Sequence, residues 1–396
     1  MPYYPRTIEE KIKASVTDDK IIILTGMRRV GKTTLFRQIA NDLENKVFFD
    51  FENPLDSKLF EDVDYNDVFE RIIVRGGLDR TQRINVFIDE VQLYPGVSRV
   101  AKYLHDHYNI KFFLTGSASY YLKNLFPETL AGRKVIFELF PLSFEEFLLF
   151  RGVDIEHFHA LQKKHPVSLV DFEIYDALYE EYVRWGGFPE VVLATTEEKK
   201  RERAEGIFTS YYQKEVVQLG DWSKKEQFRD LIILLASRVG SRIDPTKLAS
   251  ELGITRVTLL NYVAFLEATY FVSFASRFSR NKDVVVSGSK KAYVCDNGIM
   301  RVIAETSVGM QIENAVFHQL SRQQDTTHLY YFQTERGNGI DFVVNGTVGY
   351  EVKQTATQAD VASVRNSATA ARVEEVVVLS KRYVENQEGI RFAQFV

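Results

Sequence analysis

The feature that most constrains this chain is Gly-Met-Arg-Arg-Val-Gly-Lys-Thr at positions 26–33, a complete G-x-x-x-x-G-K-[ST] motif. It follows an apolar run at 20–25, typical of a buried strand, and precedes residues 34–40, whose apolar positions have helical spacing. In that context the glycines turn backbone N–H groups toward phosphates, the lysine reaches the β- and γ-phosphates, and the threonine ligates Mg²⁺. The sequence therefore predicts a nucleoside triphosphate site formed by Gly26, Arg29, Val30, Gly31, Lys32, Thr33 and Thr34.

An acidic pair ends the candidate strand at 84–90. Asp89 is predicted to hold the Mg²⁺, and Glu90 is predicted to polarise the attacking water as a general base. Such a pair is common in loops, but it is a strong signal when it follows a phosphate-binding loop. A switch GTPase would not need a carboxylate at position 90, so Glu90 predicts hydrolysis as well as binding.

Two further residues are candidates for catalysis. Thr115 follows a third apolar strand, at 110–114, where a hydroxyl could sense the γ-phosphate, although Thr-Gly-Ser is also an ordinary strand exit. Arg133 lies in a loop-like Ala-Gly-Arg segment. It is either an arginine finger supplied to a neighbouring subunit or one half of a surface salt bridge, and both readings stay open.

Composition narrows the class of protein. None of the apolar runs in the 396 residues approaches the roughly 20 needed for a membrane span. The start of the chain has no apolar signal-peptide core, and one cysteine excludes an intrachain disulfide. We therefore expect a cytoplasmic protein with no membrane partner. A net charge of −4 gives no bulk attraction to nucleic acid, so any such binding needs a local patch.

The pattern along the chain predicts four parts. Residues 1–150 alternate strands and helices, as in an α/β protein with a parallel sheet. Residues 151–240 show only helical periodicity and are expected to form a helical lid or linker. A winged helix is expected at 241–291 and a further α/β domain at 292–396.

The winged-helix prediction rests on a short helix, a glycine turn and a longer helix, followed by two strand-like runs. Residues 271–291 carry five basic side chains against one acid, a local net charge of +4. The second helix offers few base-reading side chains, which favours contacts with DNA phosphates. The candidate DNA-binding residues are Arg256, Arg277, Arg280 and Lys282. The alternative is a winged helix used only for packing between domains.

The last hundred residues contain a hairpin signal around Asn-Gly-Thr at 345–347. A two-residue turn would send Asp341 away from Glu351, whereas a three-residue loop would place them opposite each other. Only the second register assembles a site for Mg²⁺ or Mn²⁺, with Lys353 beside it and Glu313 as a third carboxylate, and we expect this three-residue loop or an equivalent bulge. A cross-strand ion pair between Glu351 and Lys353 explains those two residues almost as well.

Taken together, the chain resembles the prokaryotic AAA+ ATPases, with an AAA_14-type P-loop domain, whose C-terminal part is the domain of unknown function DUF4143. The resemblance rests on residues 26–34, 89–92, 114–117, 131–133, 141–147, 186–189, 293–298, 313–314, 340–341 and 351–353. It implies ATP hydrolysis, a winged helix and a C-terminal fold similar to PD-(D/E)xK nucleases. Asp341, Glu351 and Lys353 match that nuclease pattern.

These observations give two hypotheses for function. The first is a homo-oligomeric ATPase that acts on DNA, uses ATP and Mg²⁺, and couples nucleotide state to a winged helix and a nuclease-like domain with a second metal. The second is a regulatory or signalling NTPase whose C-terminal domains bind protein partners and do not cleave DNA. The local charge at 271–291 favours the first, and the overall acidity favours the second.

Overall fold

The computed structural model describes residues 3–117, 132–218, 224–280, 288–323, 325–334 and 339–396. The chain divides into an N-terminal unit, Met1–Phe140 with Ala268–Tyr270, and a C-terminal unit, Pro141–Glu267 with Phe271–Val396. This differs from the expected four parts. The first boundary lies at 141 rather than 150, and the parts expected at 151–240, 241–291 and 292–396 share one unit.

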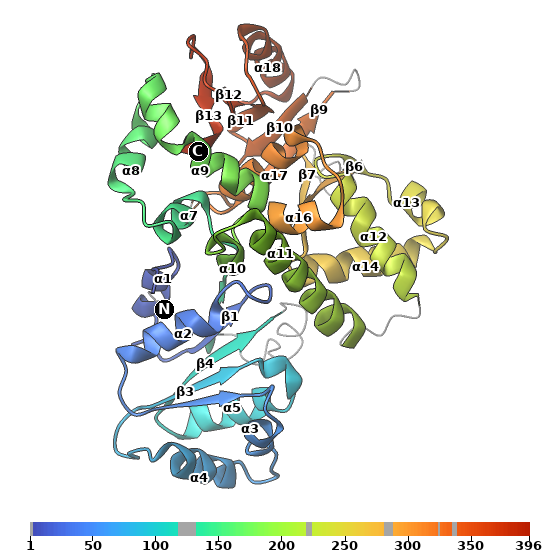
Figure 1. Cartoon of the computed structure of the whole chain (residues 1–396). Coiled ribbons are helices and arrows are strands. Elements are labelled where there is room, and N and C mark those ends of the chain that lie inside the picture. Colours follow the sequence, from blue (N-terminus) through green and yellow to red (C-terminus); the bar gives the residue numbers. More distant parts are fainter. Residues whose placement is uncertain (1–2, 118–131, 219–223, 281–287, 324, 335–338) are drawn as a thin grey trace. The chain divides into compact units, whose positions relative to one another are not determined.

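The N-terminal unit is built on a parallel sheet with the strand order β2-β3-β4-β1-β5 (Figure 1). The strands are β1 (Ile21–Thr25), β2 (Lys46–Asp50), β3 (Ile84–Asp89), β4 (Ile110–Gly116) and β5 (Lys134–Glu138). The helices are α1 (Glu9–Ala14), α2 (Lys32–Asn41), α3 (Pro54–Lys58), α4 (Tyr65–Gly76), α5 (Val97–His107) and the single turn η1 (Val91–Leu93).

Helices cover both faces of this sheet. On one face Phe36 of α2 meets Phe87 and Phe113 edge-on, with ring centroids 5.9 Å apart in each pair. On the other face Ile88 and Leu114 pack in a buried cluster with apolar residues of α4 and α5. Consecutive side chains of β3 and of β4 thus point to opposite faces of the sheet, as strand geometry requires. The near-continuous apolar runs that predicted this sheet follow from that two-sided burial.

The C-terminal unit begins with helices. Ser143 and Glu146 form the predicted capping box at the start of α7, which explains why this helix opens the second unit. The helices up to residue 240 are α7 (Phe144–Phe150), α8 (Glu156–Lys163), α9 (Leu169–Trp185), α10 (Pro189–Val192), α11 (Glu197–Tyr211), the π-helical segment η3 (Tyr212–Gln218) and α12 (Lys225–Ser237).

The rest of this unit forms a mixed sheet with the order β13-β12-β11-β10-β9-β7-β8-β6. Its strands are β6 (Arg242–Ile243), β7 (Val272–Arg277), β8 (Lys290–Val294), β9 (Leu329–Gln333), β10 (Gly339–Val344), β11 (Val348–Lys353), β12 (Glu375–Ser380) and β13 (Ile390–Phe392). The helices between them are α13 (Pro245–Glu251), α14 (Arg256–Ala268), α16 (Asn297–Ile303), α17 (Val308–Ser321), α18 (Gln358–Ala371) and the turn η4 (Ala393–Phe395).

One strand pairing crosses the boundary expected at 291. β7 pairs in parallel with β9, with Ser276 opposite Tyr330 and Arg277 opposite Tyr331. The first strand-like run expected in the wing, at 271–274, is therefore continuous with the C-terminal sheet, whereas the second, at 284–286, lies outside the described residues. Local periodicity predicts each strand but carries no signal for a parallel pairing between segments so far apart in sequence.

The hairpin of β10 and β11 has the register that brings the carboxylates together. Residues 345–347 form a three-residue loop, and Phe342 lies opposite Tyr350, so the next pair outward is Asp341 and Glu351. The prediction of a three-residue loop is confirmed. A bulge between Ile340 and Val343, where β10 pairs with β9, adds one residue to this strand.

The apolar face of α14 differs from the one its spacing indicated. The helical spacing of Val257, Leu260, Val263 and Leu266 indicates one apolar face, but the buried residues are Leu259, Tyr262, Phe265 and Leu266, so only Leu266 is common to both sets. Val257 is 69% exposed and Leu260 is 40% exposed. The helix is apolar on more than one side, so periodicity alone could not select the buried face. Among the described residues no helix combines the length and apolar character needed to cross a membrane.

Candidate nucleotide site and C-terminal carboxylate cluster

The phosphate-binding loop joins β1 to α2 through backbone conformations that favour glycine. Gly26 has φ +145° and Gly31 has φ +104°. A Cβ on Gly26 would lie 2.0 Å from the carbonyl oxygen of Leu139, so no side chain fits there. Lys32 is buried, and its Nζ donates to the carbonyls of Gly26 at 2.8 Å and Met27 at 3.1 Å. Its ammonium therefore lies within the loop that cradles phosphates in such motifs.

The remaining predicted loop residues divide between the backbone turn and the surface. Arg29 has φ +65°, Val30 is fully buried, and Thr34 is exposed on α2. Arg6, which the sequence interpretation missed, supports the loop: its guanidinium donates to the carbonyls of Val30 at 2.9 Å and Phe140 at 2.8 Å. An arginine this far from the motif in sequence gives no local signal.

The Asp89 carboxylate joins the loop to the ends of two strands. Thr33 Oγ1 donates to Asp89 Oδ2 at 2.6 Å, and Thr115 Oγ1 donates to Asp89 Oδ1. The Glu90 N–H in turn donates to Thr115 Oγ1 at 3.2 Å. Hydroxyl and carboxylate oxygens are hard ligands that suit Mg²⁺. Thr33 and Asp89 thus fit the metal-binding role predicted for them, and Thr115 lies beside them.

The Glu90 side chain is held by two neighbouring groups. Gln92 Nε2 donates to Glu90 Oε2 and also to Ser117 Oγ, the latter at 2.9 Å. Arg28 of the phosphate-binding loop pairs with the same Glu90 oxygen, with 3.8 Å between N and O. The sequence interpretation assigned no role to Arg28, Gln92 or Ser117. The only sequence feature that pointed to a role for these three residues was their position next to the recognised motifs.

A further carboxylate lies at the end of the neighbouring strand. Asp50 pairs with Asp89 in the parallel register of β2 and β3. Partial burial raises the pKa of the Asp50 carboxyl, and the Asp89 carboxylate acts in the same direction. The edge of the sheet next to the phosphate-binding loop therefore gathers negative charge, which suits a bound cation.

Arg133 lies near the amino ends of the strands, whereas the phosphate-binding loop lies at their carboxyl ends. Its carbonyl accepts the Ile21 N–H at 2.8 Å, at the start of β1, whereas the loop follows Thr25 at the end of that strand. Five residues of strand span roughly 16 Å. Arg133 Nε forms an ion pair with Asp106 Oδ1 at 2.9 Å, on the surface. The residue is thus distant from the site of its own chain.

Comparison with known proteins is in keeping with this geometry. Residues 18–148, which contain the phosphate-binding loop, Asp89 and Thr115, match the model of the AAA domain family. The chain is also similar to a Walker-type ATPase of Pyrococcus abyssi, with a TM-score of 0.51 and 16% identity over 76% of this chain and 96% of that one. That likeness supports the fold.

Relatives at moderate identity cover most of the chain. An uncharacterized protein of Haemophilus influenzae is 28% identical over 77% of this chain and 75% of its own length. One of Methanocaldococcus jannaschii is 25% identical over 97% of this chain and 86% of its own length. The AAA domain implies ATP as the nucleotide and Mg²⁺ as its metal, as the sequence predicted.

The family matched in the C-terminal unit differs from the expected one. Residues 176–308 match a domain of unknown function, DUF8612, rather than DUF4143. This match spans the expected boundaries at 240 and 291, in keeping with the single C-terminal unit.

The predicted DNA-binding residues have different environments. Arg256 and Arg280 are exposed, and Arg280 also donates to the Arg372 carbonyl at 3.3 Å. Arg277 is half-buried and donates to the Gln333 carbonyl at 2.9 Å, within the sheet. Lys282 lies outside the described residues. Arg277, one of the five basic side chains counted at 271–291, therefore makes a contact within the sheet.

The four nuclease-type residues do converge in the C-terminal sheet. The Asp341 N–H donates to Glu351 Oε2 at 3.3 Å, and the Val352 N–H donates to Asp341 Oδ2 at 3.0 Å. Lys353 Nζ donates to Glu351 Oε1 at 2.7 Å. Glu313 of α17 is linked to Asp341 by a shared partner, the ammonium of Lys291.

This cluster does not form the predicted second metal site. In the part of the chain that the structure describes, no group of three or more histidine, cysteine, aspartate and glutamate side chains could hold a metal ion. The physical reason is the Lys291 ammonium, which lies 3.2 Å from Glu313 Oε1 and 3.2 Å from Asp341 Oδ1. A cation of the chain itself thus bridges the two carboxylates.

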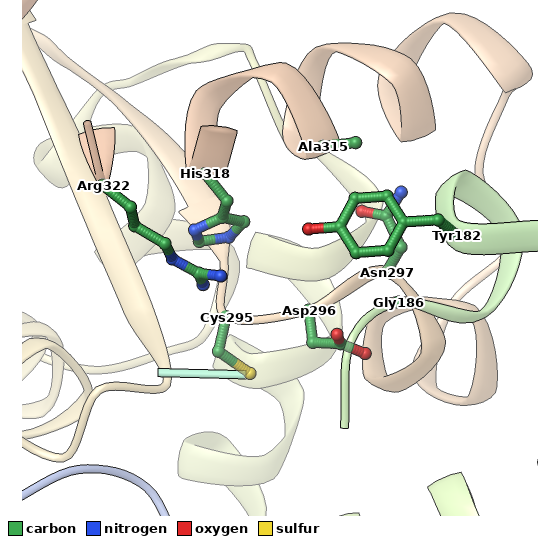
Figure 2. A pocket seen from close by; sticks show the side chains of 8 residues that line it. All are labelled: Tyr182, Gly186, Cys295, Asp296, Asn297, Ala315, His318 and Arg322. Atoms are coloured by element: carbon green, nitrogen blue, oxygen red, sulfur yellow. The ribbon is translucent and has the colours of Figure 1, made fainter. Parts of the chain in front are cut away.

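A small cavity in the C-terminal unit is too small for a substrate (Figure 2). Its volume is about 10 Å³, roughly the room needed for one water. It is lined by Tyr182, Gly186, Cys295, Asp296, Asn297, Ala315, His318 and Arg322. Asp296 accepts the N–H groups of Gly187 at 2.6 Å and Gly298 at 2.8 Å, so it ties the Gly-Gly turn after α9 to the start of α16.

We predict that replacing Lys32 and replacing Glu90 impair different steps, ATP binding and ATP hydrolysis respectively. Lys32→Ala should weaken ATP binding, because the phosphates lose their cation. Glu90→Gln should bind ATP but turn it over at least ~10²-fold more slowly, because the amide cannot accept the proton of the attacking water. Nucleotide binding and single-turnover hydrolysis with Mg²⁺ measure the two effects separately. Wild-type turnover in the Glu90→Gln protein would remove the general-base assignment.

We also predict that His318 makes the C-terminal unit sensitive to acid. Burial, with the nearby Arg322 acting in the same direction, lowers the pKa of His318 from 6.5 to about 3. The imidazole also contacts the Val294 carbonyl at 2.6 Å. As the pH falls, the unfolded chain binds a proton on His318 before the folded chain does. The contribution of His318 to the free energy of unfolding is therefore complete above pH 6.5. It is lost as the pH falls from there toward 3.

The test compares wild type with His318→Gln between pH 8 and pH 5.5, by tryptophan fluorescence during urea unfolding. Both tryptophans, Trp185 and Trp222, fall in the sequence range of the C-terminal unit, although Trp222 lies outside the described residues. Between pH 8 and pH 5.5 the free energy of unfolding of wild type should fall by about 1.4 kcal/mol more than that of the variant. Asp296, whose pKa burial raises to about 6, contributes with the opposite sign in both proteins and so cancels. Replacement of the exposed His328 by Gln is the control, and equal losses in wild type and His318→Gln would contradict the assignment.

Proposed function

We propose that this chain hydrolyses Mg²⁺-ATP with Glu90 as the general base and couples hydrolysis to a DNA-binding element at residues 225–294. The observation that carries the first part is the contact of Asp89 with both Thr33 and Thr115, with Glu90 as the next residue. Mg²⁺ held by Thr33 and Asp89 would neutralise charge on the phosphates. Lys32 binds the β- and γ-phosphates, and Glu90 accepts a proton from the water that attacks.

The second part of the proposal rests on the order of elements in residues 225–294. Three helices, α12, α13 and α14, and the strands β6, β7 and β8 follow one another in a pattern typical of a winged helix, and β8 pairs with both β7 and β6. A tight turn at Gly253, with φ +64°, separates α13 from α14. In helix-turn-helix proteins the N-terminal residues of the second helix contact DNA, and here those residues begin with Arg256.

A second candidate function has its own support. Val257 and Leu260 are large apolar side chains exposed on α14. Adjacent exposed apolar residues are typical of protein interfaces, although a thymine methyl group can also contact such side chains. A protein partner on this face would make the chain a regulatory NTPase, without DNA.

The two functions make opposite predictions for variants of residues 225–294. If DNA is the partner, duplex or single-stranded DNA should stimulate ATP turnover, and Arg256→Ala with Arg280→Ala should reduce that stimulation. Each lost phosphate contact should also lower the slope of log binding constant against log salt concentration by about 1. Lys163→Ala, an exposed basic residue on α8, is the matched control.

The paired variant Val257→Ser with Leu260→Ser tests the rival. It should leave DNA stimulation of turnover nearly unchanged if the phosphates are the main contact. Turnover that ignores DNA at every salt concentration, together with loss of a co-purifying protein partner in this apolar variant, would favour the regulatory NTPase instead.

We further propose that the active ATPase is a homo-oligomer in which Arg133 completes a neighbouring site. The position of Arg133 far from its own phosphate-binding loop supports action on a second subunit. ATP turnover per chain should then rise with protein concentration. Mixing Arg133→Ala chains with Lys32→Ala chains should restore activity, because some interfaces regain both halves of the site.

Asp106→Asn separates the two interpretations of Arg133. It removes the surface ion pair, worth about 0–1 kcal/mol, but leaves the guanidinium in place. If Arg133 acts as a finger, Arg133→Ala should abolish most turnover while Asp106→Asn retains it. Similar, small effects of both substitutions would leave only the salt bridge.

A further inference from the structure

The carboxylate cluster of the C-terminal sheet contains a cation from a distant part of the chain. Lys291 lies on β8, whereas Glu313 lies on α17 and Asp341 on β10. The Lys291 Nζ lies 3.2 Å from an oxygen of each carboxylate. Its side chain is largely shielded, with 14% exposed, and so are those of Glu313 with 19% and Asp341 with 21%.

The surroundings fix Glu313 in this arrangement. Tyr293, two residues after Lys291 on the same strand, donates its hydroxyl hydrogen to Glu313 Oε1 at 2.9 Å. Gly240 packs against the same carboxylate so closely that a Cβ there would lie 2.6 Å from Glu313 Oε2. Gly240 also has φ +73°, so two constraints favour glycine at this position.

Asp341 and Glu351 are equally engaged. Asp341 Oδ2 accepts the Val352 N–H, and its Oδ1 faces Lys291. Glu351 accepts from Lys353 and from the Asp341 N–H. Burial, and then the Asp341 charge, raise the pKa of Glu351 to about 7. The bulge in β10 lets both Asp341 and Phe342 contact the side of the sheet that α17 covers, since the Phe342 ring packs at a tilt against those of Tyr293 and Phe317.

The charge of the cluster is therefore largely compensated without a metal. Three carboxylates, Glu313, Asp341 and Glu351, face two ammonium groups, those of Lys291 and Lys353. A divalent ion would have to displace the Lys291 ammonium from Asp341 and Glu313, or add its charge to a site that is already close to neutral. The residues present thus do not fit the metal that a nuclease-like fold implies.

We infer that Lys291 serves as a built-in cation that takes the place of a divalent metal, closing this carboxylate cluster and joining β8 to α17 and β10. The cluster is then a structural junction within the C-terminal unit. A divalent ion enters only when the Lys291 ammonium is removed.

The test measures Mn²⁺ binding to the full chain without nucleotide, by electron paramagnetic resonance of the free ion. Lys291→Met keeps the apolar stem and removes the charge. It should gain one Mn²⁺ site that wild type lacks. Adding Asp341→Asn to Lys291→Met should abolish the gain. Lys290→Met is the matched control, because Lys290 is the neighbouring residue but is exposed and lies over the Phe274 ring.

Wild type and Asp341→Asn provide an arm that does not depend on the folding of the Lys291 variant. In an otherwise wild-type chain, Asp341→Asn should leave Mn²⁺ binding unchanged. If it removes a Mn²⁺ site, the cluster binds metal despite Lys291 and the inference is overturned. A Lys291→Met chain with wild-type circular dichroism and tryptophan fluorescence but no added Mn²⁺ site would also overturn it.

Discussion

The contact between Asp89 and two threonine hydroxyls is the constraint on which the nucleotide site depends. Thr33 lies in the first turn of α2, Asp89 is the last residue of β3, and Thr115 lies on β4. The Asp89 carboxylate therefore joins three segments of the N-terminal unit. Each of these positions is fixed by the parallel sheet, because the carboxyl ends of its strands meet at one edge. The buried aromatic packing of Phe36 against Phe87 and Phe113 holds α2 on that sheet, and with it the phosphate-binding loop. Chemistry at Glu90 therefore requires the core beneath it.

Features encoded by adjacent residues could be predicted from the sequence. The phosphate-binding loop, the acidic end of β3 and the capping box at Ser143 each depend on a few neighbouring positions. The same holds for the three-residue loop at 345–347, since loop length sets the register of a hairpin. Predicting Asp341 opposite Glu351 needed no information from outside the hairpin.

Features that depend on distant segments could not be predicted in this way. The parallel pairing of β7 with β9 merges two expected domains, and neither strand carries a sign of its partner. Arg6 reaches the phosphate-binding loop only through the fold. Lys291 was counted among the five basic side chains at 271–291, yet its partners lie on α17 and β10. The buried side of α14 was ambiguous for a different reason, since its apolar residues occur on several faces.

The two carboxylate sites of this chain show how neighbours decide what an acidic residue can do. Asp89 receives neutral hydroxyls from Thr33 and Thr115, which leave its negative charge uncompensated and which can themselves be oxygen ligands. Asp341 receives an ammonium and a backbone N–H, which compensate the charge and offer no lone pair to a metal. The residue type is the same in both places, and both follow a pattern associated with Mg²⁺. The difference lies in the partner atoms, and those partners make the N-terminal carboxylate suitable for a metal cofactor and the C-terminal one suitable for holding the sheet together.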